Sequence, residues 1–184
     1  PGILDLWFQK RVEYKNEMKK YGKAGDDEKY AFYHKRQLVQ KILLNSLYGV
    51  LGLPAFRFYD VDNATAVTTT GQTVIKSTAD MANIKYNKEL GNPDLDSNIY
   101  IDTDSVFFSA VPLMDKRFPN WKDEEQVVIA GYVDDIAGEM QDYLNDFYDI
   151  MSEKIFNVDK DKHRLEIKKE YVAKAGLWIA KKRY

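Results

Sequence analysis

A short acidic hairpin is the feature that most constrains the fold of this 184-residue chain. Two runs of apolar, β-branched and aromatic residues, at 99–101 and 106–108, flank the segment Asp102-Thr103-Asp104-Ser105. Such runs on either side of a short polar link are typical of two antiparallel strands joined by a tight turn. The sequence therefore predicts a small antiparallel sheet at residues 98–110.

Helical patterns surround this hairpin. We predict helices at about 4–21, 28–48, 63–90 and 123–155, and further short strands at 56–59, 164–172 and 177–184. The first two helices are separated by Gly25-Asp26-Asp27, where an Asp can cap the second helix, so the two should form a helical hairpin. The order of elements predicts an α+β fold, in which a helical hairpin is followed by a small antiparallel sheet packed on helices.

The composition excludes several classes of protein. Hydrophobic residues make up 45% of the chain, which supports a packed core and argues against disorder. There is no Cys, so disulfides and thiolate zinc sites are excluded. No apolar run approaches the roughly 20 residues that cross a bilayer, and we expect no membrane partner. Since the chain starts at Pro1 and not at Met, we expect it to begin within a longer protein.

Charge by itself leaves the type of partner open. The formal net charge is −2, but Lys and Arg concentrate in residues 1–41 and 181–183, while residues 123–149 are acidic. A basic binding face can exist on a protein of negative net charge. An ordinary solvated surface of mixed charge explains the same pattern.

The two carboxylates of the hairpin suggest a metal site. Residues two apart on an extended chain point to the same face, and two carboxylates roughly 6 Å apart repel by about 3 kcal/mol at an effective dielectric near 20. Magnesium ions would offset this repulsion, and a pair of them stabilises the attacking and leaving oxygens of phosphoryl transfer. A solvated turn, in which Asp is common, is the other interpretation, and Asp102-Thr103-Asp104 taken alone favours it.

A polar stripe marks the second predicted helix. At about 100° per residue, Lys41, Asn45 and Tyr48 fall on one narrow face. Arg11 and Lys15 are i,i+4 neighbours on the first helix. Together the two helices offer cations for phosphate, an amide for polar contacts and a ring for stacking, so an anion with several phosphates could bind between them. An ordinary solvated helix face is the alternative.

Taken together, these residues resemble family B DNA polymerases. The segment 41–49, Lys-Ile-Leu-Leu-Asn-Ser-Leu-Tyr-Gly, is similar to the fingers motif Lys-x-x-x-Asn-Ser-x-Tyr-Gly, and 100–105 is similar to the palm motif Tyr-x-Asp-Thr-Asp-Ser. Lys181-Lys182-Arg183-Tyr184 is similar to the primer-binding motif. Arg11 and Lys15 stand where the family has an Arg-x-x-x-Lys pair. The resemblance covers nearly the whole chain, with the motifs in the family's order.

The resemblance implies template-directed DNA synthesis, in which two Mg²⁺ ions assist transfer of a nucleotide from a dNTP to a primer 3′-OH and pyrophosphate leaves. Three cations would grip the triphosphate, and one of them, Lys41, would also protonate the pyrophosphate; the other two are Arg11 and Lys15. Asn45 and Tyr48 would line the nascent base pair.

For the palm, the resemblance implies that Asp104 ligates the metal pair, with Asp102 as a weaker or indirect participant. Thr103 would lie near the primer end, and Lys181, Lys182, Arg183 and Tyr184 would hold the primer strand. Glu170 would lie close to the metals without ligating them directly. Lys168 stands where many members of the family carry an acidic residue.

The resemblance also implies a division of the chain. Residues 1–52 would be the fingers hairpin and 53–184 a partial palm, an incomplete domain without the upstream acidic motif, the exonuclease domain or the thumb. We expect the isolated chain to be inactive and to act inside cells, in phage-infected bacteria for example. Expected partners are primer–template DNA, dNTP, the remaining part of the polymerase (exonuclease, upstream palm segment and thumb) and a sliding clamp.

Two rival interpretations stay open. The chain could be a non-catalytic, DNA-binding remnant of a polymerase, which divalent-ion dependence of binding would test. It could also be the palm of a reverse transcriptase or an RNA polymerase. Those enzymes usually place adjacent carboxylates in this hairpin, and the motif at 41–49 does not fit them.

Overall fold

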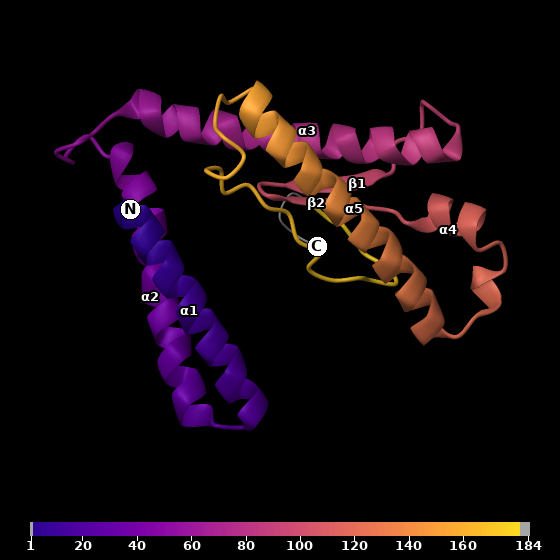
Figure 1. The fold of residues 1–184 in the computed structure, drawn as a ribbon, viewed down its shortest axis with the longest axis horizontal. Coiled ribbons are helices and arrows are strands. Elements are labelled where there is room, and N and C mark those ends of the chain that lie inside the picture. Colours follow the sequence, from indigo (N-terminus) through magenta and orange to yellow (C-terminus); the bar gives the residue numbers. More distant parts are fainter. Residues whose placement is uncertain (1, 181–184) are drawn as a thin grey trace. The chain divides into compact units, whose positions relative to one another are not determined.

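The structure, a computed structural model, describes residues 2–180. These contain five α-helices, a short 3₁₀-helix and one two-stranded antiparallel sheet (Figure 1). The predicted α+β fold is confirmed. The chain forms two compact units, Pro1–Thr69 and Thr70–Tyr184, and each is described by itself. Within the described residues no helix is both long and apolar enough to span a membrane.

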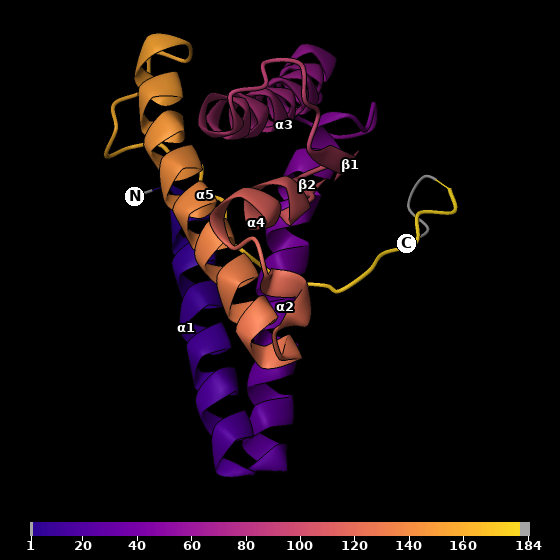
Figure 2. The same cartoon turned by 90° about the vertical axis from the view of Figure 1, so that its right-hand side faces the viewer.

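The first unit is a helical hairpin of α1 (Ile3–Ala24) and α2 (Asp27–Leu51), which lie side by side in Figures 1 and 2. Gly25 ends α1 in the left-handed conformation, with φ 70°, which glycine adopts without strain. Asp26 begins α2, because its carboxylate accepts a hydrogen bond from the N–H of Lys29 at 3.0 Å. The cap formed by Asp26 confirms the Asp cap that the sequence predicts for this turn.

Aromatic rings hold the two helices together. Tyr33 of α2 stacks on Tyr21 with ring centroids 5.5 Å apart and lies 6.2 Å from the ring of Tyr14. No residue of α1 or α2 is fully buried. The hairpin therefore has one apolar seam and two open flanks, and side chains on those flanks are available to ligands.

The strand predicted at 56–59 is wrong. This segment is a series of turns, in which the N–H of Phe56 donates to the carbonyl of Leu53 at 2.9 Å and the N–H of Tyr59 donates to that of Phe56 at 3.0 Å. These local hydrogen bonds satisfy the backbone without a neighbouring strand. The carboxylate of Asp60 then accepts the N–H of Asn63 at 3.0 Å and caps α3 (Val61–Leu90).

The core of the second unit is formed by α3, α4 (Val111–Arg117) and α5 (Gln126–Lys154), with a 3₁₀-helix at Trp121–Asp123. Its buried apolar side chains recur at helical spacing on α3 (Ala82, Tyr86) and on α5 (Ile136, Met140, Leu144), and α4 adds two adjacent ones (Leu113, Met114). The Thr78 and Tyr148 hydroxyls, 2.7 Å apart, join α3 to α5. The helix predicted at 123–155 is confirmed, whereas α4 was not predicted, because seven residues are too few for a clear periodic pattern.

The acidic hairpin lies beside this core. β1 (Asn98–Asp102) pairs with β2 (Ser105–Phe108), with Ile101 opposite Val106 and Asp102 opposite Ser105. Phe108 packs against the core, where its ring lies edge-on to Tyr86 at 5.6 Å. The small antiparallel sheet predicted from the sequence is therefore confirmed.

The strands predicted at 164–172 and 177–184 do not form within the described residues, and residues 181–184 lie outside them. Side chains of α5 take the place of a neighbouring strand along the first segment. Asn145 donates to the carbonyl of Ile167 at 3.1 Å and accepts the N–H of the same residue at 2.9 Å. Gln141, one turn away on α5, accepts the N–H of Lys169 at 2.8 Å. The backbone is thus satisfied on one edge by a helix and not by a sheet.

One more turn of α5 extends this ladder. The His163 ring lies 2.9 Å from an Asp149 carboxylate oxygen through Nε2, and the N–H of Leu165 donates to Nδ1 at 3.2 Å. Hydrogen bonds from Lys160 and, to a lesser extent, His163 lower the pKa of the Asp149 carboxyl. Residues 163–169 are therefore fixed in register along α5.

Replacement of Asn145 by Ala is expected to free this segment. Loss of both hydrogen bonds to Ile167 should accelerate amide exchange at Ile167 at least about fivefold, because each bond contributes on the order of 1 kcal/mol. Hydrogen exchange followed by NMR or mass spectrometry measures this. Asp146→Ala, at the adjacent exposed position of α5, is the control and should leave exchange at Ile167 unchanged. Equal exchange in the Asn145 variant and the wild type would contradict the ladder.

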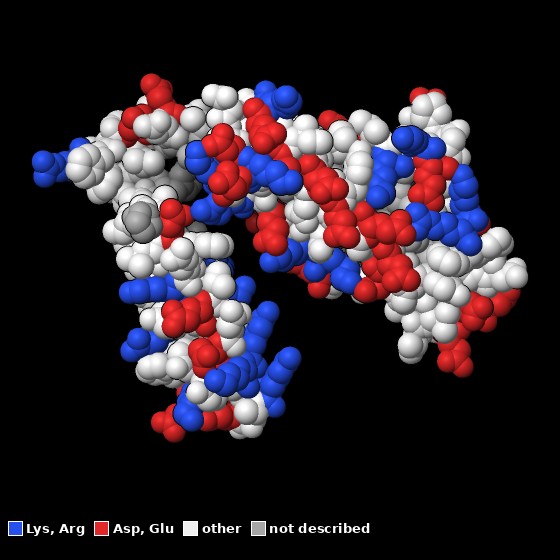
Figure 3. Space-filling view, in the orientation of Figure 1, with Lys and Arg blue, Asp and Glu red and all other residues white. Residues whose placement is uncertain are grey.

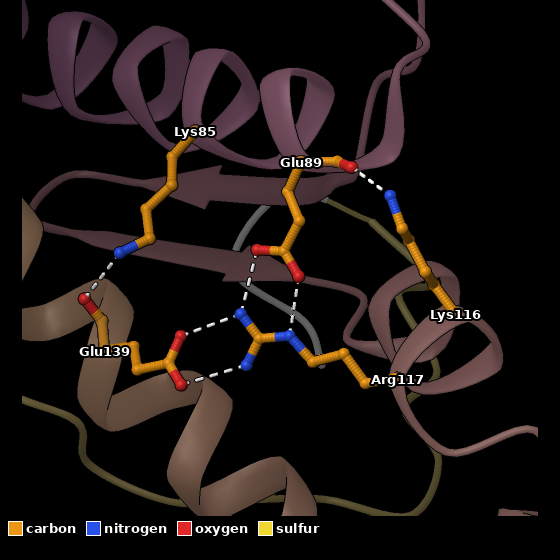
Figure 4. Close-up of polar contacts among 5 residues, drawn as sticks. All are labelled: Lys85, Glu89, Lys116, Arg117 and Glu139. Carbon is orange, nitrogen blue, oxygen red and sulfur yellow. Dashed lines mark hydrogen bonds and ion pairs between the residues drawn. The ribbon is translucent and has the colours of Figure 1, made fainter.

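Three helices of the second unit also meet at an ion-pair cluster (Figure 4). Arg117 of α4 bonds Glu89 of α3 at 2.6 and 2.8 Å and Glu139 of α5 at 2.9 and 2.8 Å. Lys116 donates to the main-chain carbonyl of Glu89, and Lys85 donates to that of Glu139 at 3.0 Å. One guanidinium thus connects α3, α4 and α5 through two bidentate contacts.

Candidate active site

The acidic segment forms a tight turn between the two strands. Asp102 ends β1, Thr103 and Asp104 form the turn, and Ser105 begins β2. The N–H of Asp104 donates to the carbonyl of Asp102 at 2.6 Å, and the hydroxyl of Ser105 donates to the same carbonyl at 3.1 Å. The sequence predicts that the two carboxylates point to the same face, as residues two apart on a strand do. Because a turn residue separates Asp102 from Asp104, strand alternation does not set the relative direction of their carboxylates.

Thr103 is strained. Its φ is +52°, a value that a β-branched residue rarely adopts, and the hydrogen bond between residues 102 and 104 closes a γ-turn around it. Such a conformation costs on the order of 1–3 kcal/mol and persists where the surrounding structure enforces it, often at functional sites. The Thr103 hydroxyl donates to the Asp102 carboxylate at 3.0 Å, which fixes one carboxylate oxygen.

The carboxylates of this turn fit part of a magnesium site. Asp102 is half-buried and Asp104 is exposed, and both offer the oxygen donors that Mg²⁺ prefers. The described residues contain no group of three or more His, Cys, Asp or Glu side chains that could hold a metal ion. Asp102 and Asp104 can provide two carboxylates, and Mg²⁺ commonly keeps several water ligands beside one or two carboxylates.

The C-terminal segment packs against the same hairpin. Phe107 of β2 lies 6.1 Å from the ring of Tyr171 and 5.8 Å from that of Trp178. Glu170 directly precedes Tyr171 in the chain, and its side chain is exposed. Trp178 fixes the chain three residues before the predicted primer-binding segment, Lys181, Lys182, Arg183 and Tyr184, which itself lies outside the described residues.

In the first unit the three predicted phosphate-binding cations lie on one flank of the α1–α2 hairpin. Arg11 lies 14 residues before the turn at Gly25 and Lys41 lies 16 after it, so the two are nearly level. Helical geometry directs Arg11, Lys15 and Lys41 to the same side of the aromatic seam. None of the three makes an ion pair with a described residue, and Arg11 Nε is buried without a hydrogen-bond partner there.

Asn45 and Tyr48 continue this flank toward the end of α2. Asn45 lies one turn beyond Lys41, Tyr48 follows after three more residues, and both side chains are exposed. The structure therefore brings five predicted residues together on the hairpin: Arg11, Lys15, Lys41, Asn45 and Tyr48. In the second unit it brings Asp102, Thr103 and Asp104 together in one turn.

The charged side chains are distributed differently on the hairpin and on α5. Figure 3 shows Lys and Arg interspersed with Asp and Glu, with a band of acidic residues along α5. Lys and Arg outnumber Asp and Glu on the hairpin, by ten to six over residues 1–52. The excess of cations on the hairpin suits a polyanion.

Several structural residues around the site were missed by sequence analysis. The contacts of Asn145 with Ile167 and of Phe107 with Trp178 join positions far apart in the sequence. A signal for the first was present, because Gln141, Asn145 and Asp149 recur every four residues on one face of α5. No local pattern marks Arg117 as a contact of both Glu89 and Glu139.

The comparison with known families decides the identity. The family model described as DNA polymerase family B matches residues 1–118, more than half of the chain. The chain belongs to DNA polymerase family B. The matched residues include both the 41–49 segment on α2 and the 100–105 segment, so the match covers one motif in each unit, while residues 181–184 lie beyond it.

Curated members of family B support the assignment. The DNA-directed DNA polymerase of Escherichia phage RB69 is 33% identical over 158 residues, and that of Enterobacteria phage T4 is 34% identical over 160 residues; each match covers 80% of this chain. The DNA polymerase alpha catalytic subunit of Drosophila melanogaster is 34% identical over 111 residues, 59% of this chain. The matched region spans only 17% of the phage enzymes and 7% of the fly subunit.

Proposed function

We propose that this chain provides the nucleotide-gripping hairpin and part of the metal centre of a template-directed DNA polymerase. The observation that carries the proposal is the strained acidic turn at Asp102-Thr103-Asp104, in a chain that belongs to DNA polymerase family B. In this proposal residues 1–52 act as fingers and 53–184 as part of the palm. Primer–template DNA and dNTP are the substrates.

On the hairpin, Arg11, Lys15 and Lys41 bind the triphosphate of the incoming dNTP. Their unpaired charges cost little reorganisation when the anion arrives, which is the condition for electrostatic stabilisation of phosphoryl transfer. Lys41 also delivers a proton to the departing pyrophosphate. Asn45 and Tyr48 contact the base pair that forms.

In the palm, Asp104 is the metal ligand, Asp102 is a weaker or indirect one, and the Thr103 hydroxyl holds the Asp102 carboxylate in place. A carboxylate from outside this chain would complete the ligands of a pair of Mg²⁺ ions. These ions would neutralise charge at the attacking and leaving oxygens. Glu170 lies near the metals, while Lys181, Lys182, Arg183 and Tyr184 bind the primer strand. The remaining polymerase regions are required partners, and a sliding clamp is a further one.

Primer extension tests this function. The chain alone should bind DNA without extending a primer, and the chain mixed with the remaining regions of a family B polymerase should extend it when Mg²⁺ is present. Lys41→Ala should lower the extension rate by about 10²–10³-fold, because a transition-state contact is lost. Lys23→Ala, an exposed lysine near the turn of the hairpin, is the matched control and should be silent.

A non-catalytic, DNA-binding role is the second candidate. It is favoured by the excess of Lys and Arg over Asp and Glu on residues 1–52, ten against six, which attracts a polyanion without any metal. DNA binding without extension in every mixture, and without dependence on divalent ions, would support this role over the polymerase.

A further inference from the structure

The opposite flank of the α1–α2 hairpin contains a groove that nucleotide incorporation does not use. Tyr14 of α1 and four residues of α2 line it, with a volume of about 340 Å³: Lys35, Arg36, Val39 and Gln40. At 100° per residue, Lys35 and Val39 project about 120° and 160° away from Lys41 around α2. The groove is therefore separate from the cations proposed to bind dNTP.

A planar cation crosses the aromatic surface of this flank. The guanidinium of Arg36 lies 4.4 Å from the ring centroid of Phe32 and 5.9 Å from that of Tyr14. Phe32 and Val39 are 49% and 52% exposed. A guanidinium plane held by aromatic rings leaves a π surface on which a further ring can stack.

The groove also contains charged and polar groups that have no ion-pair or hydrogen-bond partner among the described residues. Within the described residues, neither Lys35 nor Arg36 lies within ion-pair distance of a carboxylate. Gln40 Oε1 is buried and has no hydrogen-bond partner among the described residues. Rotation of this amide would offer its oxygen to a donor in the groove, which would satisfy a group that is otherwise costly to bury.

We propose that this groove binds one unpaired nucleotide of a single DNA strand. The base stacks on Arg36 and Tyr14, its exocyclic amino group donates to Gln40, and the flanking phosphate pairs with Lys35. Cations beside aromatic rings are the arrangement by which proteins hold single strands. This contact is additional to the proposed polymerase function and needs neither metal nor catalysis.

The size and charge of the groove favour a nucleotide over a peptide helix. Its volume is at the lower end of the roughly 300–1,000 Å³ typical of small-ligand sites. An apolar helix would cover Lys35 and Arg36 without pairing them, which costs free energy. A polyanionic strand pairs both cations and offers its base edge to Gln40.

Fluorescence anisotropy of a labelled 12-residue oligo(dA) with the purified chain tests the proposal. The double variant Lys35→Gln/Arg36→Gln should bind about tenfold more weakly, with the slope of log K against log salt reduced by about 1. Arg36→Lys keeps the charge but loses the plane, so it should weaken oligo(dA) binding about threefold or more with an unchanged slope. The control Lys19→Gln/Lys20→Gln makes the same charge change elsewhere on the hairpin and should have an effect under twofold.

Other outcomes overturn the proposal. Equal weakening in the control would show general electrostatic attraction, and an unaffected Lys35/Arg36 variant would exclude the groove. Displacement of oligo(dA) by millimolar dAMP would show that the groove takes free nucleotides instead of a strand. Photocrosslinking of an iodocytosine-substituted oligonucleotide, whose base keeps an exocyclic amino group, locates the contact directly. Crosslinks at Tyr14 or Phe32 support the groove, and crosslinks confined to other segments contradict it. Because no extension is measured, an inactive polymerase leaves this test intact.

Discussion

Asp104→Asn is expected to abolish primer extension by the assembled polymerase, with a loss on the order of 10³-fold or more, while DNA binding survives. The substitution removes one negative charge and keeps the shape of the side chain. Asp104 is exposed, and it holds the turn through its main-chain N–H, which the substitution keeps. The fold should therefore be unchanged, and the loss reports the carboxylate alone. Steady-state extension in Mg²⁺ measures it.

Two matched variants sharpen this result. Asp102→Asn should cause a smaller loss, because Asp102 is the weaker participant and its carboxylate is already bonded by Thr103. Asp135→Asn, an exposed acid on α5, makes the same chemical change away from the turn and should retain full activity. Extension by Asp104→Asn at a near wild-type rate would return the acidic segment to the role of a solvated turn.

Elements determined by neighbouring residues could be predicted from the sequence. The turn between α1 and α2 depends on Gly25 and Asp26, whose conformational preferences act within three or four residues. The hairpin of β1 and β2 also has a local cause, since its two apolar runs are separated by only the four polar residues 102–105. Strand-like segments at 56–59 and 164–172 failed for the opposite reason, because a strand needs a partner that the local sequence does not specify.

The candidate site could also be predicted only in part from the sequence. The stripe of Lys41, Asn45 and Tyr48 follows from helical periodicity, so its common face could be derived from the sequence. The conformation of Thr103 could not, because threonine is normally unfavourable at positive φ and nothing in its neighbours predicts an exception. The groove at Arg36 could not be predicted from the sequence either, since it requires Tyr14 of the other helix.

Arg117→Met is expected to lower the free energy of unfolding of the second unit by about 2 kcal/mol at neutral pH. The side chain of Arg117 is only 24% exposed, and it is the cation bonded by the carboxylates of both Glu89 and Glu139. Removal of the guanidinium leaves these carboxylates close to each other and loses the connection of α4 to α3 and α5. Lys122→Met removes a cation from an exposed pair with Asp115 and should cost under about 0.5 kcal/mol.

The pH dependence separates this cluster from simple loss of packing. Hydrogen bonds from Arg117 lower the pKa of Glu89 and the pKa of Glu139 in the folded protein. The stabilisation that comes from these two lowered pKa values is therefore complete above the ordinary glutamate pKa of 4.5. It is lost as the pH falls through that value and on through the lowered pKa values. In the variant, acid neutralises two repelling carboxylates, although Lys85 and Lys116 still face them. In denaturant titrations, the difference in the free energy of unfolding between wild type and Arg117→Met should thus shrink from pH 7 to pH 4. A difference that stays constant would mean that Arg117 acts through packing and not through charge.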